Sequence, residues 1–210
     1  MKKNLNERRL PSFSLDFEKG NMKEEVRENR SDNRLFVEDV SVDLSYHEFH
    51  ECRFEKLTFS TDGEGCLFAD VIFDHCDLSN INFHEVVCRR VEFHNCRLTG
   101  IDFTRSTLED VLFENCECSY ANFSNSKCKR CSLQGTRFLE AGFSMCSFMH
   151  MEIDDCDFMG AELVDTSLRG MDFSNSRIDN ILVSAEGLKG VIVNEVQAVA
   201  CAKLLGIIVK

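Results

Sequence analysis

The sequence predicts an all-β fold, a four-sided parallel β-helix, and three observations support this prediction. An apolar residue recurs at every fifth position from Phe68 to Val193. The position two residues before each of these centres is small or β-branched in most repeats. Residues spaced by twenty alternate in charge along one side. A period of five fits neither a helix face, with its period of 3.6, nor a strand, with its period of 2. The chain must therefore turn a corner every five residues.

The charge alternation indicates how many repeats make one coil. If a coil holds four repeats, residues that are twenty apart stack on neighbouring coils, which lie ~4.8 Å apart. One such column changes sign at every step: Asp77, Arg97, Glu117, Arg137, Asp157 and Arg177. Each exposed ion pair is worth only ~0–1 kcal/mol, so the column matters as a marker of register rather than as a source of stability.

The register is interrupted near the start of the repeat. Apolar centres run at five-residue spacing from Leu44 to Phe59, but the next centre is Phe68. We therefore expect a four-residue loop made of Asp62, Gly63, Glu64 and Gly65, since glycines and acidic residues favour turns. With this loop removed, Arg53 lies above Asp77, and the β-helix extends from residue 41 to residue 193.

Each end of the repeat has two possible roles. Residues 1–40 form either a loosely docked arm or a cap over the first coil, because the end of a β-helix exposes strand edges and apolar centres. Residues 194–210 read as a helix with Asn194 as its N-cap, followed by a strand at Ile207–Val209. This end is either a terminal cap or a dimer interface across a two-fold axis. The expected interface residues are Val196, Val199, Ala200, Leu204, Leu205, Ile207, Ile208 and Val209.

Composition argues against several function classes. A net charge of −12 disfavours direct binding of nucleic acid. No segment is apolar enough to span a bilayer, and the N-terminus lacks a secretory apolar region, so we expect a cytoplasmic protein without membrane contact. The twelve cysteines should then be reduced core thiols, because thiolates in a line do not converge on a tetrahedral metal. We expect no cofactor, no metal and no enzymatic activity; a thiol-based metal or redox store is the remaining alternative.

One face carries the main functional signal. Between residues 66 and 193, the face with centres Phe73, Phe93 and Phe113 has carboxylates and no basic residues. With the first coil included, the expected acidic face contains Glu48, Glu51, Asp74, Glu92, Glu114, Glu152, Asp154, Asp155 and Asp172. Their spacing of about 4 Å approaches the ~3.4 Å per phosphate of a DNA strand. The face either keeps the rod soluble or imitates DNA in a basic groove.

Two sequence resemblances refine this view. The repeats at residues 101–103 (Ile-Asp-Phe) and 121–123 (Ala-Asn-Phe) resemble the A(D/N)LXX consensus of pentapeptide-repeat proteins. That resemblance implies a right-handed β-helix whose repeat centres point inward. The segments CRF at 52–54, GEGCLFADVIFDHCDLSNINF at 63–83 and VNEVQAVACAKLLGIIVK at 193–210 resemble the Qnr quinolone-resistance family. The chain lacks the second, longer loop that many Qnr members have.

The Qnr resemblance implies a DNA-mimicking homodimer that binds DNA gyrase and topoisomerase IV and protects them from quinolones. The acidic rod would occupy or remodel the DNA-binding saddle, and the loop at residues 62–65 would touch the enzyme. The alternative is a structural protein–protein interaction module, in which the arm at residues 1–40 binds a partner unrelated to topoisomerases.

Overall fold

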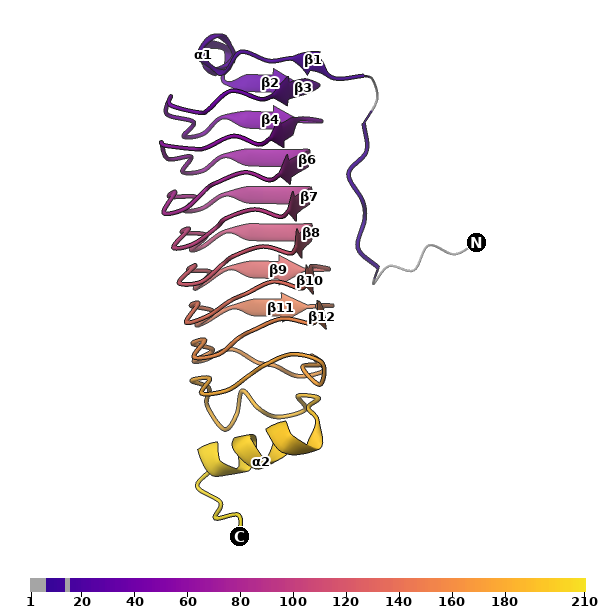
Figure 1. The fold of residues 1–210 in the computed structure, drawn as a ribbon, viewed down its shortest axis with the longest axis vertical. Coiled ribbons are helices and arrows are strands. Elements are labelled where there is room, and N and C mark those ends of the chain that lie inside the picture. Colours follow the sequence, from indigo (N-terminus) through magenta and orange to yellow (C-terminus); the bar gives the residue numbers. More distant parts are fainter. Residues whose placement is uncertain (1–6, 14–15) are drawn as a thin grey trace, which may run out of the picture.

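The protein is a rod of stacked parallel coils, described by a computed structural model for residues 7–13 and 16–210 (Figure 1). All strands join one parallel sheet, so the predicted β-helix is confirmed. The strands are β1 (Glu18–Lys19), β2 (Arg30–Asp32), β3 (Arg34–Phe36), β4 (Glu48–His50), β5 (Arg53–Glu55), β6 (Leu67–Asp74), β7 (Val87–His94), β8 (Thr107–Glu114), β9 (Lys127–Lys129), β10 (Ser132–Gln134), β11 (Ser147–Met149) and β12 (Glu152–Asp154). The helices are α1 (Met22–Glu25), a 3₁₀ turn (Val26–Glu28) and α2 (Glu195–Leu204).

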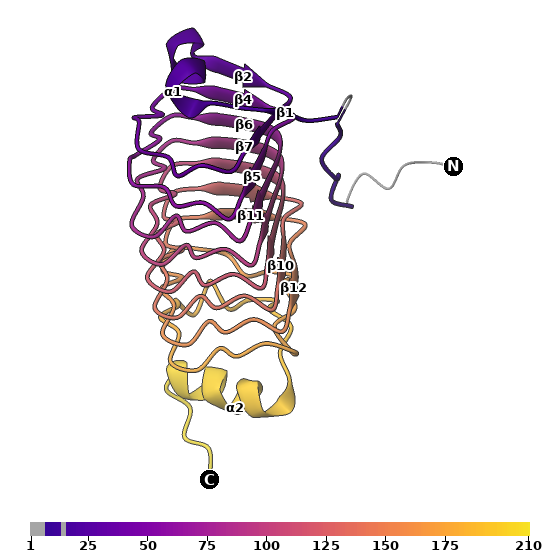
Figure 2. The ribbon, with the colours of Figure 1, turned by 45° about the horizontal axis from the view of Figure 1, so that its top comes forward.

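The corners explain the period of five. In most repeats the residue two positions after the centre adopts a left-handed conformation, with φ of 58° at Asp70, 55° at His75, 59° at Asn80 and 57° at Glu85. A positive φ reverses the local turn of the chain and recurs here at five-residue intervals. Four such corners complete one coil, and the coils stack into a column when viewed obliquely (Figure 2).

Stacked phenylalanines fill the interior. Phe54, Phe73, Phe93 and Phe113 form one column with successive ring centroids 4.7, 4.8 and 4.9 Å apart and ring planes within 6° of parallel. All four side chains are buried. Each aromatic pair adds about 0.5–1.5 kcal/mol to the free energy gained by burying its apolar area.

The predicted charge column exists. Backbone bridges join each of its members from Asp77 to Arg177 to the next. The charges pair two by two, with N–O distances of 3.4 Å for Arg97–Asp77, 2.9 Å for Arg137–Glu117 and 3.5 Å for Arg177–Asp157. The structure therefore has four repeats per coil from β6 onward.

The structure has no inserted loop at residues 62–65, contrary to the sequence prediction. Gly63 is a buried repeat centre, and its N–H donates to the Asn82 carbonyl at 3.0 Å. A Cβ at Gly63 would lie 2.7 Å from the Phe83 ring, so this centre must be glycine. The coil is one residue short rather than four residues long, since Phe54 pairs with Phe73. Arg53 consequently lies beside Ile72, and not above Asp77.

The β-helix also begins earlier than predicted, at β2. Ser31 and Phe36 lie above Phe49 and Phe54 and are buried, so they act as centres of an additional coil. The residues before β2 have both of the considered roles. Residues 18–28, which include α1, cover this coil and bury Met22. Residues 7–13 run down the side of the rod as an extended arm (Figure 1).

The C-terminal end contains the predicted helix but not the predicted strand. Asn194 caps α2, with its side chain accepting from the Gln197 N–H in a capping box. Residues 207–209 adopt no regular structure, because no strand edge lies beside them, and Ile208 is 85% exposed.

Candidate protein-docking surface

The acidic face is built from β5, the second halves of β6, β7 and β8, and then β10 and β12. Two predicted members lie elsewhere, because the first coil has a different register from the one expected. Glu48 pairs with Leu67 on the neighbouring face, and Glu51 occupies the corner, where its N–H donates to Ala69. The first coil instead contributes Glu55 and a basic residue, Arg53.

The half of this face that is nearer the N-terminus, which we call the upper half, has its negative charges neutralised by basic side chains. Asp74 contacts Arg53 at 3.3 Å and His75 at 2.6 Å. Glu92 contacts Arg8 of the arm and His94, both at 2.9 Å. These carboxylates therefore already have basic partners in the folded chain.

His94 bridges two carboxylates across neighbouring coils. Its Nε2 lies 2.9 Å from Glu92 and its Nδ1 lies 2.7 Å from Glu114. The hydrogen bond to Glu92 raises the pKa of His94, although partial burial opposes this effect. The same hydrogen bond lowers the pKa of Glu92. A protonated His94 thus removes much of the negative potential around the upper carboxylates.

The lower half of the face is different. Its carboxylates are exposed and form no ion pair with a basic side chain of the described residues. We call them the lower acidic patch: Glu152, Asp154, Asp155 and Asp172. Two neutral donors contact the patch: Asn175 Nδ2 donates to Asp154 at 2.5 Å, and the Ser174 N–H donates to Asp172 at 2.9 Å. The intervening coil carries Ser132 and Gln134 at the outward positions, so the nine carboxylates do not form one continuous DNA-like row.

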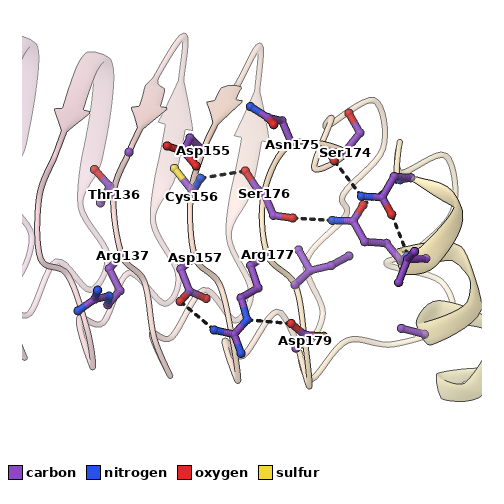
Figure 3. A pocket seen from close by; sticks show the side chains of 16 residues that line it. Thr136, Arg137, Asp155, Cys156, Asp157, Ser174, Asn175, Ser176, Arg177 and Asp179 are labelled. Atoms are coloured by element: carbon purple, nitrogen blue, oxygen red, sulfur yellow. Dashed lines mark hydrogen bonds and ion pairs between the residues drawn. The ribbon is translucent and has the colours of Figure 1, made fainter.

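A groove of about 590 Å³ borders the patch, between Asp155 and the charge column (Figure 3). Arg177 lies across its lower part and contacts Asp157 at 3.5 Å and Asp179 at 2.8 Å. The N-terminus of α2 closes the end of the groove. The patch is therefore next to a wall of alternating charge.

α2 covers the last coil through polar contacts. The Gln197 side chain is buried and donates to the Phe173 carbonyl at 2.9 Å and to the Ser176 carbonyl at 2.6 Å. These bonds satisfy carbonyls that another coil would otherwise satisfy. The predicted apolar residues of this end face away from the core, and all are exposed: Val196, Val199, Ala200, Leu204, Leu205, Ile207, Ile208 and Val209.

The described residues also show what this part of the chain offers for three other kinds of site: a membrane span, a metal site and a reactive thiol. They include no helix that is long and apolar enough to cross a membrane. No group of three or more metal-ligating side chains comes together within them. All twelve cysteines are free thiols, and eleven are buried. Burial raises the pKa of Cys66 to about 12, so this thiol is a core group rather than a nucleophile.

The fold defines a parallel β-solenoid protein. Residues 66–141 match a family model described as "Pentapeptide repeat region". This part of the chain is therefore similar to a pentapeptide-repeat region. No curated protein matches the sequence.

Solved structures of similar fold include two of interest. HetL, a pentapeptide-repeat protein involved in heterocyst differentiation in the cyanobacterium Nostoc, is 14% identical, with a TM-score of 0.47 over 79% of this chain and 90% of that chain. QnrB1, a plasmid-mediated fluoroquinolone resistance protein, is 20% identical, with a TM-score of 0.27 over 85% of this chain and 90% of that chain.

Proposed function

We propose that this protein binds the basic DNA-binding surface of a type II topoisomerase, DNA gyrase or topoisomerase IV, and protects it from quinolones. It acts by occupying that surface, without turnover. The Qnr-like sequence segments suggest the partner. The alternative is a structural interaction module, in which the arm at residues 1–40 binds a partner unrelated to topoisomerases.

The lower acidic patch is the observation that supports this function best. Glu152, Asp154 and Asp155 project from one coil and Asp172 from the next coil, ~4.8 Å away, and no basic side chain of the described residues pairs with them. An unpaired row of charge on a rigid scaffold attracts an oppositely charged groove and orients it during encounter. The upper half of the face is less suited to this role, because Arg8, Arg53 and His94 already neutralise it.

Charge reversal of the patch is expected to weaken this binding strongly. The triple variant Glu152→Lys, Asp154→Lys and Asp155→Lys should weaken gyrase binding by about tenfold or more, because like charges would then oppose each other. It should also lose protection in a supercoiling assay with ciprofloxacin. Binding should be measured at low salt, since about 0.1 M salt screens exposed charges beyond ~10 Å.

The matched control reverses three exposed acids away from the patch: Glu140→Lys, Glu162→Lys and Asp165→Lys. It changes the net charge equally, and we expect it to alter gyrase binding by less than about threefold. Equal losses in both variants would show that net charge, not the patch, attracts the enzyme. Absence of both rescue and low-salt binding with the unchanged protein would refute the topoisomerase proposal itself.

We also propose that the protein is a homodimer joined through its C-terminal end. Val196 and Ile208 are 81% and 85% exposed, and they lie with six other apolar residues at the tip of the rod. An isologous contact would bury this surface on both copies at once and double the length of the rod. The exposed tail could also gain in the second copy the strand partner that it lacks here.

Placing charges in this surface is expected to produce monomers. Val196→Asp with Ile208→Asp should raise the dimer dissociation constant by about a hundredfold or more, because each copy would bury two carboxylates. Sedimentation velocity over a concentration series measures this change. Leu182→Asp is the control, since Leu182 is 53% exposed on the side of the rod. A chain that is monomeric before any substitution would exclude the dimer.

A further inference from the structure

Polar contacts of Arg8, Arg9 and Ser12 join the described part of the N-terminal arm to the rod. Arg8 forms an ion pair with Glu92 at 2.9 Å, and the two side chains are only 14% and 13% exposed. The backbone N–H of Arg9 donates to Asp110 at 2.9 Å, and that of Ser12 donates to Asp70 at 2.9 Å. The arm therefore covers acidic groups on three successive coils.

The acceptors of the two backbone bonds, Asp70 and Asp110, belong to a column of corner residues. Asp70 also accepts from Arg90 at 2.6 Å, and Asp110 accepts from Arg130 at 2.7 Å. Each aspartate thus binds a guanidinium of the rod and still has lone pairs for a backbone donor of the arm. An extended segment in which an arginine lies close to free backbone N–H groups therefore supplies the hydrogen-bond donors that the carboxylates of this column can still accept.

The described apolar contacts of the arm are few, and the ring contact is that of Phe13 with Phe17 beside β1, with centroids 5.0 Å apart. Leu10, which lies between the contacts, is 65% exposed. A segment that is held by a few polar contacts and buries little apolar surface opens at a low free-energy cost. The arm is therefore the part of the molecule that is easiest to displace without unfolding the coils.

We propose that residues 7–13 are a displaceable strap that withholds the upper acidic groups from a basic partner. In the strapped state Arg8 takes the place of a partner's arginine at Glu92. A partner that supplies enough basic side chains competes for the same carboxylates and releases the arm. The strap thereby lowers affinity for weakly basic proteins and leaves the lower acidic patch open as the first contact.

The test uses the full chain and nona-arginine as the basic probe, with no topoisomerase present. Amide hydrogen exchange at Arg9 and Ser12 should be measurably slower in the free protein than in an unstructured chain, because both N–H groups donate to buried or half-buried carboxylates, although easy opening of the arm keeps this protection modest. A saturating amount of nona-arginine at low salt should raise the exchange rate of both amides toward that of an unstructured chain. Unprotected amides in the free protein, or exchange that nona-arginine does not change, would overturn the proposal.

A pair of variants separates release of the strap from a change in net charge. Arg8→Ala should tighten nona-arginine binding by about fivefold, because the competing arm is lost. Arg27→Ala removes the same charge from an exposed site in the 3₁₀ turn and should tighten binding by less than about twofold. Equal effects of the two substitutions would contradict the proposal. Failure here leaves the topoisomerase function untouched, since that function is measured with a different partner.

Discussion

Replacing Phe93 with alanine is expected to lower the free energy of unfolding by about 4 kcal/mol. The Phe93 ring is fully buried and stacks between Phe73 and Phe113, with centroids 4.8 and 4.9 Å away. Truncation removes both stacking contacts and leaves a cavity, since the backbone bonds of the coils hold the neighbouring rings apart. Chemical denaturation monitored by far-UV circular dichroism measures the change.

Two substitutions calibrate this expectation. Phe93→Leu keeps most of the volume and should cost about 1.5 kcal/mol or less. Phe148→Ala should cost clearly less than Phe93→Ala, because Phe148 is only partly buried and its nearest aromatic neighbour is at 6.1 Å. A solenoid is stabilised by contacts between neighbouring coils, so a central defect should also make unfolding less cooperative. Equal losses at Phe93 and Phe148 would contradict the stacked-core account.

The regular part of the fold could be predicted because each repeat obeys the same local rule. From β6 onward a large centre, a small neighbour and a left-handed corner recur together, and the charge column gives the register. The rule failed where the core uses an unexpected residue. Gly63 is a centre because the Phe83 ring fills its space, and Ser31 is a centre because it contacts His47 Nε2 at 2.9 Å. A pattern of apolar centres does not detect either residue.

The candidate surface was harder to predict than the fold. Its lower carboxylates follow from register alone, and the structure places Glu152, Asp154, Asp155 and Asp172 as expected. Glu48 and Glu51 were predicted on the wrong face. The coil that contains them is one residue shorter than expected, and this shifts the register of every residue before that point. The contact of Arg8 with Glu92 joins residues far apart in sequence, and no periodicity relates the arm to the rod. Glu55 could have been found only with the correct register.

The second large effect is expected at the buried ion pair of the corner column. Arg130 and Asp110 side chains are only 4% and 3% exposed, and the guanidinium donates twice to the carboxylate at 2.7 Å. Arg130→Met should lower the free energy of unfolding by about 3–5 kcal/mol at neutral pH, because it leaves a buried carboxylate without its cation. The matched control is Arg90→Met in the pair with Asp70, where Arg90 is 31% exposed, and we expect a loss of about 1 kcal/mol or less.

The pH dependence of the Arg130→Met effect distinguishes a lost charge partner from lost packing. Burial would raise the pKa of Asp110, but hydrogen bonds from Arg130 and from the Arg9 backbone lower it below the ordinary value of 3.8. In the unchanged protein this stabilisation is present above pH 3.8 and is lost as the pH falls through the folded pKa. Without Arg130 burial dominates, the pKa of Asp110 rises above 3.8, and the carboxyl is protonated in the folded state at mildly acidic pH. The difference between the two proteins should therefore be largest near neutral pH and shrink as the pH falls toward 4. A difference that stays constant over this range would show that Arg130 acts through packing alone.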